Sequence, residues 1–181
     1  MKKTEKIKAP LTKGVAKVPV IMQMEALECG AACLAMISAY YGKWVPLEQV
    51  RRDCGVSRDG SNARNVLVAA RSYGLEAKGY RFEPEALRTD GQFPCIIHWD
   101  MEHFVVLDGF QKDKAVLNDP ARGLVSVSME EFDRENVKLA MRLRTLLDAR
   151  IPLSEIPKRM LSMDDVHSPL TTFNYRNFHY L

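Results

Sequence analysis

Long apolar runs are missing from this sequence of 181 residues. The longest one, residues 31–41, is interrupted by Ser38 and is too short to span a bilayer. The lysine-rich N-terminus is not followed by the apolar segment that a secretory signal requires. We therefore expect a soluble, cytoplasmic chain.

Strong net charge is also missing, since the formal value is only +3. The basic residues are not interleaved with aromatic ones, so no nucleic-acid partner is predicted. One local bias exists: residues 1–19 hold six lysines and a single acid, Glu5. We interpret residues 1–17 as a basic N-terminal arm, solvated and mobile, with contact to an acidic membrane surface or partner as the alternative.

Cysteine is scarce, with four residues in the chain, at positions 29, 33, 54 and 95. A chain with 46% hydrophobic residues can bury a core without covalent staples, so we expect reduced thiols. The sequence contains no phosphate loop of the Walker type and no Gly-x-Ser-x-Gly motif. These absences argue against ATP hydrolysis by the chain itself and against the common serine hydrolases.

The pattern of elements predicts an α+β fold, with N-terminal helices packed on a mostly antiparallel sheet. Helices are expected at 28–41, 46–54, 62–73 and 129–135, with one helical turn at 84–87. Strands are expected at 75–82, 95–99, 103–110, 115–118, 124–128 and 137–144, although a helix is the alternative for the last. We assign residues 18–144 to one domain. Residues 145–181 are assigned to a C-terminal tail of unknown role, in which 146–160 resembles an amphipathic helix interrupted by prolines.

Cys29 is the first candidate for chemistry, because it lies at the predicted start of a buried helix. A helix N-terminus carries positive partial charge and free N–H groups, which favour a thiolate and can hold an oxyanion. Gly30 has no side chain, so a substrate backbone could approach closely. The alternative is that Cys29 is one more small core residue.

A base and an orienting group are needed beside such a thiolate. His103 begins a predicted strand and is the candidate base, with His98 as its rival. Asp119 follows another strand and can orient the imidazole, but its neighbour Asn118 is an alternative. Side-chain alternation lets only one of the two face the histidine.

Gln23, six residues before Cys29, is a candidate side-chain donor to a developing oxyanion. A tetrahedral metal site is the competing chemistry, and its four ligands would be Cys29, Cys33, His98 and His103. We disfavour it because an offset of five residues places the two histidines on opposite faces of a strand. No cofactor or metal is predicted.

Three stretches together resemble the bacteriocin-processing cysteine peptidases, the papain-like N-terminal domains of peptidase-containing ABC transporters. They are the segment from Gln23 through Cys29 to Ile37, the run from His103 to Leu107, and Asn118-Asp119-Pro120. The resemblance covers residues 18–144 and looks strongest to the branch that processes lanthipeptides and related modified peptides. It implies Cys29 as nucleophile, His103 as base, Asp119 as orienting acid and Gln23 as oxyanion donor.

The resemblance also implies a substrate and partners. The substrate would be a precursor peptide whose leader binds as an amphipathic helix, with the cut after Gly-Gly or Gly-Ala. The partners would be membrane and ATPase domains that place the peptidase at the cytoplasmic face of the bacterial inner membrane. The alternatives are a docking module that binds leaders without cutting, or another Cys–His acyl-transfer enzyme such as an amidase.

Overall fold

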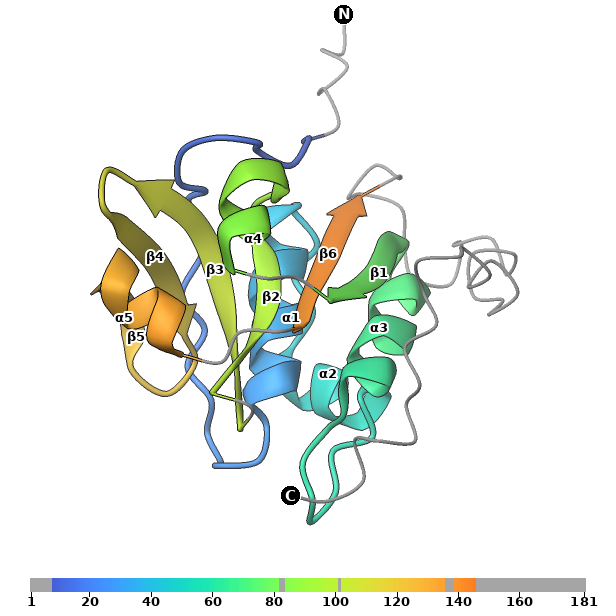
Figure 1. Cartoon of the computed structure of the whole chain (residues 1–181). Helices are drawn as coiled ribbons and strands as arrows, with labels where there is room; N and C mark the ends of the chain where they lie inside the picture. Colours follow the sequence, from blue (N-terminus) through green and yellow to red (C-terminus); the bar gives the residue numbers. More distant parts are fainter. Residues whose placement is uncertain (1–7, 82–83, 101, 136–138, 146–181) are drawn as a thin grey trace, which may run out of the picture.

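The computed structural model describes residues 8–81, 84–100, 102–135 and 139–145. A single antiparallel sheet of six strands runs through it in the order β1-β6-β2-β3-β4-β5 (Figure 1). The strands are β1 (Leu75–Arg81), β2 (Cys95–Trp99), β3 (His103–Gln111), β4 (Lys114–Asp119), β5 (Gly123–Ser128) and β6 (Leu139–Thr145). Strand β6, the last in the sequence, therefore lies between β1 and β2 and joins the two parts of the sheet.

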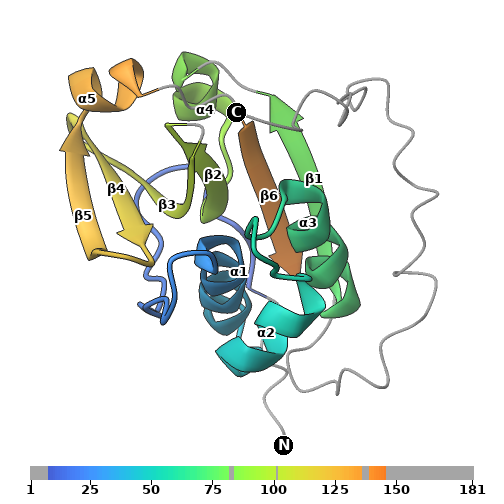
Figure 2. The same cartoon turned by 90° about the horizontal axis from the view of Figure 1, so that it is seen from below.

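Helices cover both faces of this sheet. Figure 2 shows α1 (Cys29–Tyr40), α2 (Leu47–Asp53) and α3 (Ala63–Ser72) on one side. The two short helices α4 (Pro84–Asp90) and α5 (Met129–Arg134) lie on the other side. The predicted α+β arrangement is confirmed. The strand expected at residues 137–144, with a helix as the alternative, is confirmed as β6 for residues 139–144, the described part of that range. The 146–160 segment lies outside the described residues.

Helix α1 is the centre of the larger core. Every residue from Gly30 to Tyr40 is buried, as its apolar character on all sides predicts. A second, smaller core lies on the opposite face, where Leu87 and Phe132 from α4 and α5 pack on β2, β3 and β4. The sheet thus has a buried hydrophobic layer on each face, and this packing holds α1 against β3.

The described part of the basic arm packs against this body, in contrast to the solvated arm that its lysines predicted. Leu11 exchanges two backbone hydrogen bonds of 2.7 Å with Phe93, and the N–H of Ala16 donates to Asp108 O over 2.8 Å. A Cβ on Gly109 would stand 2.0 Å from the carbonyl oxygen of Gly14, so only glycine permits this approach. Backbone hydrogen bonds hold the described part of the arm, and such bonds cannot be predicted from the charges of its side chains.

Candidate active site

Cys29 is the first residue of α1 and is half-buried. Glu28 occupies the N-cap position, but its side chain makes no capping hydrogen bond to the helix. The positive end of the helix therefore points at the thiol without a competing side-chain acceptor. Free N–H groups at this position are what a thiolate or an oxyanion would use.

His103, the first residue of β3, contacts the Cys29 thiol. Burial opposes ionisation of Cys29, but the hydrogen bond with His103 and the backbone N–H groups of Phe104 and Gly30 outweigh it and lower the pKa of the thiol. The same Cys29 contact, helped by Asp119, raises the pKa of the His103 imidazole against the effect of burial. Both shifts favour a thiolate–imidazolium pair.

Asp119 contacts the imidazole of His103. Its Oδ1 lies 2.9 Å from His103 Nε2, and only 2% of its side chain is exposed. This meeting follows from topology, because β3 and β4 are antiparallel neighbours, so the start of one lies beside the end of the other. Burial opposes ionisation of Asp119, but His103, Arg122 and the N–H of Ala121 outweigh it and lower the pKa of the carboxyl.

The two rival residues point elsewhere. The amide of Asn118 donates to Val18 O over 3.2 Å and so holds the backbone directly after the N-terminal arm. The His98 ring lies on Phe104, with 4.6 Å between ring centroids. Burial and the nearby His103 charge lower the pKa of His98 to about 4, so it is neutral at physiological pH.

Gln23 lies beside the turn that follows Asp119, since its N–H donates to Pro120 O over 2.8 Å. Its side-chain Nε2 donates to Glu25 O at 3.1 Å and to Ala26 O at 3.4 Å, while Oε1 is buried without a hydrogen-bond partner among the described residues. The amide is thus placed by the path of the loop that follows it.

The packing around Gly30 requires a glycine, whether or not a substrate approaches it. A Cβ there would stand 2.6 Å from Ser61 Oγ and 3.2 Å from Phe104 Cδ2. The glycine is therefore needed for packing of α1 against β3 and the Ser61 loop. Cys33, one turn further along α1, donates its thiol hydrogen to Phe104 O. Within the described ranges, no group of three His, Cys, Asp or Glu side chains is arranged to hold a metal ion.

Comparison with known proteins shows which family this chain belongs to. The family model described as "Peptidase C39 family" matches residues 17–144. The chain belongs to this family. It is therefore a cysteine peptidase domain of the C39 type, which the sequence resemblance had predicted.

Two solved structures and one curated relative illustrate the family. A double glycine motif protease from an AMS/PCAT transporter, solved with a leader peptide, is 67% identical, with a TM-score of 0.75 over 76% of this chain and 99% of that one. The peptidase domain of Streptococcus ComA, at 24% identity and a TM-score of 0.65, covers 70% of this chain and 97% of that one and shares the fold. The Colicin V secretion/processing ATP-binding protein of Escherichia coli is 39% identical over 70% of this chain, which spans only 18% of that protein.

Sequence reasoning missed three side chains of this C39 site. Arg122 Nε lies 2.6 Å from Asp119 Oδ2, and Arg51 pairs with Glu28, which directly precedes Cys29. Glu28 could have been found from the sequence, since a carboxylate at the start of an apolar segment needs a partner when it is buried. Arg51 could not be found this way, because it lies on a different helix.

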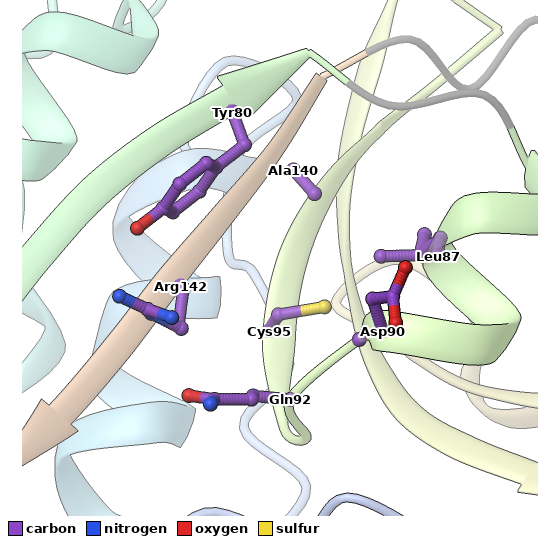
Figure 3. A pocket seen from close by; sticks show the side chains of 8 residues that line it. Tyr80, Leu87, Asp90, Gln92, Cys95, Ala140 and Arg142 are labelled. Carbon is purple, nitrogen blue, oxygen red and sulfur yellow. The ribbon is translucent and has the colours of Figure 1, made fainter. Parts of the chain in front are cut away.

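A small cavity of about 50 Å³ lies at the end of β2 that is far from His103 (Figure 3). Leu87 and Asp90 from α4 face Cys95 across it, and Arg142 lies over the ring of Tyr80 at 5.0 Å. The space suits little more than a water molecule or two. Burial raises the pKa of Cys95 to about 12, which disfavours the reactive thiolate form at this place.

Among the described parts of the chain, no helix is both long and apolar enough to cross a membrane.

Proposed function

We propose that this C39 domain removes leaders from precursor peptides by cutting after a double-glycine motif. The contact of Cys29 with His103, which in turn is 2.9 Å from Asp119, carries the proposal, because a non-cleaving module would not need a thiol of lowered pKa. The 67% identity to a double glycine motif protease supports the specificity.

In the first half of the reaction, the Cys29 thiolate attacks the carbonyl carbon of the last leader residue. The oxyanion is held by the N–H of Cys29 at the start of α1 and by the Gln23 amide, whose Nε2 exchanges a loop acceptor, Glu25 O or Ala26 O, for the oxyanion. The C–N bond then breaks, and the His103 imidazolium gives its proton to the leaving amine of the core peptide. A thioester between the leader and Cys29 remains.

In the second half, neutral His103 takes a proton from water as the water oxygen attacks the thioester. The C–S bond breaks, the leader leaves with a new carboxylate, and Cys29 departs as the thiolate beside a reprotonated imidazole. Asp119 keeps the ring oriented and stabilises its charged form throughout. Neither half needs a metal or a cofactor.

The finer features of the substrate extend the same proposal. Gly-Ala is expected to be cut as well as Gly-Gly, because a narrow cleft rejects larger side chains by overlap. The leader is expected to bind as an amphipathic helix, and the precursors to be of the bacteriocin or lanthipeptide type. We further propose that residues 18–144 form the peptidase domain of an ABC transporter, at the cytoplasmic face of the inner membrane. The curated relatives, named as secretion/processing ATP-binding proteins, support this.

The test is incubation of the protein with a precursor that carries a Gly-Gly leader, read by mass spectrometry. One cut after the second glycine, absent in Cys29→Ala, is expected. A precursor with Val in place of the second glycine is the matched control and should stay intact. Leader binding without any cut would contradict the peptidase and favour the docking module.

A further inference from the structure

The carboxyl group of Glu28 lies directly before the candidate nucleophile and is fully buried, with 0% exposure. A buried carboxylate is costly unless hydrogen bonds and an opposite charge satisfy it. Its Oε1 accepts the backbone N–H of Met24 and, over 2.9 Å, that of Glu25. The side chain thus turns back onto the preceding loop and away from the first turn of α1.

Arg51 on α2 supplies the opposite charge. Its Nε lies 2.8 Å from Glu28 Oε2, an ion-pair contact outside hydrogen-bond alignment, and its Nη2 donates to Glu25 Oε2 over 3.1 Å. The arginine therefore contacts both ends of the segment from Glu25 to Glu28. One guanidinium on a rigid helix holds this loop against the body of the domain.

This loop is the one that places the Gln23 amide. At its start, the N–H of Gln23 is held by Pro120 O, in the turn after Asp119. Further on, the Gln23 side chain rests on the carbonyl oxygens of Glu25 and Ala26. The position of the amide relative to Cys29 therefore depends on the backbone path that Glu28 holds.

We infer that Glu28, neutralised by Arg51, is a positioning residue: it holds the loop from which the Gln23 amide turns from its backbone acceptors to the oxyanion. It touches no reacting atom and acts through the loop. By turning away from the helix, the Glu28 side chain also leaves the first N–H groups of α1 to the Cys29 thiol and the substrate, whereas an ordinary N-cap acceptor would compete for them. The inference rests on the proposed function, since it requires Gln23 to act in peptide cleavage.

The experiment is a double-mutant cycle between Glu28 and Gln23, measured on the full chain with a Gly-Gly precursor peptide. Removing an oxyanion donor costs about 10²- to 10³-fold in kcat, and that is the expectation for Gln23→Ala. Glu28→Ala is expected to lower kcat by about 10- to 100-fold with KM unchanged, as misplacement of that donor requires. In the Gln23→Ala background, the same change should have little further effect.

Two readouts separate positioning from a general loss of structure. The rate and pH profile of Cys29 alkylation by iodoacetamide should stay as in the wild type, because the Glu28 carboxyl is not among the groups that shift the pKa of Cys29 or of His103. Glu28→Gln should recover most of kcat, since its amide oxygen still accepts the two backbone N–H groups. If Glu28→Ala does not fold, Glu28→Asp, which keeps the charge but is one methylene shorter, replaces it.

The neighbouring pair Arg52–Glu48 on the same helix is the matched control. It is a 2.7 Å ion pair with both side chains more than half exposed, and Glu48→Ala should leave kcat unchanged. Additive losses in the cycle, or an altered alkylation profile, would overturn the inference while leaving the peptidase intact. Wild-type protein that cuts no precursor would instead overturn the proposed function, and Gln23→Ala at the wild-type rate would remove the donor on which the inference rests.

Discussion

Cys29 and Cys33 lie one turn apart in α1, yet their thiols respond to the fold in opposite ways. At the helix start, His103 and backbone N–H groups overcome the effect of burial and lower the pKa of Cys29. One turn into the core, burial raises the pKa of Cys33 well above its usual value, and the negative charges of Cys29, Asp119 and Asp108 add to the shift. The reactive form is favoured only at the edge of the helix.

The same contrast recurs in histidine and aspartate. His103 has a raised pKa beside Cys29 and Asp119, whereas burial brings that of His98 to about 4. Asp119 has a lowered pKa, whereas burial without a counter-charge raises that of Asp108 to about 8. Burial without a partner favours the neutral form of these groups. Cys29, His103 and Asp119 differ because each lies at a helix end or a strand end where hydrogen-bond partners stabilise its charged form.

The largest expected difference is between the two variants in which one of these cysteines is replaced by alanine. Cys29→Ala should abolish cleavage of a Gly-Gly precursor, because no other nucleophile replaces the thiolate. Cys33→Ala should keep the rate and lose only about 1 kcal/mol of unfolding free energy, from a buried sulfur and one weak hydrogen bond. Mass spectrometry of the products and urea unfolding measure the two effects. Equal loss of activity in both variants would contradict the contrast.

The two histidines provide the next comparison. His103→Ala should reduce kcat/KM by about 10²- to 10⁴-fold, the usual range for a general acid–base group. His98→Gln should keep most of the activity, because His98 is already neutral at this pH and its ring lies on Phe104. Steady-state cleavage at pH 7 measures both. An inactive but folded His98→Gln protein would show that the rival histidine is the base.

The Asp119→Asn variant tests, through the pH profile of cleavage, whether Asp119 raises the pKa of His103. The wild type should be active above the lowered pKa of Cys29 and below the raised pKa of His103, which gives a bell-shaped profile of kcat/KM. Without the Asp119 charge the imidazolium loses its proton more easily, so the alkaline limb should move to lower pH. The rate at the optimum should fall roughly 10- to 100-fold, in the lower part of the range for such groups. An unmoved alkaline limb would argue against the Asp119–His103 contact.

The smallest effect is expected at Asp108 and concerns stability. Because the pKa of its carboxyl is raised to about 8 in the folded state, folding takes up a proton at any pH between the unfolded pKa and that value. This group therefore lowers the free energy of unfolding as pH rises, by at most about 1.4 kcal/mol per pH unit.

Asp108→Asn should remove this dependence and gain stability relative to the wild type at pH 8 more than at pH 5, with cleavage unchanged. Urea unfolding at the two pH values measures it. A constant difference between the two proteins would contradict a buried, protonated Asp108.

Much of this architecture could be predicted from local patterns. The apolar run before Gly42 and the alternation near residues 95–128 specified α1 and the strands, because periodicity reports directly on burial. The N-terminal arm was predicted poorly, since Leu11 and Ala16 are held by backbone pairing that composition does not encode. Asn118 and Asp119 could not be separated by pattern either, because both are strand-end residues of the same turn.

The sequence by itself determined that a cysteine would begin a buried helix, that a histidine would begin a strand and that an acid would end the next one, because helix ends and strand ends follow from local apolar spacing. Only the tertiary structure decided that these three ends meet, that Asp119 faces His103 while Asn118 bonds Val18, and that Arg51 neutralises Glu28. Those contacts join residues 16 to 100 positions apart, and only the packing of the helices and the N-terminal segment on the sheet brings them within hydrogen-bond or ion-pair distance.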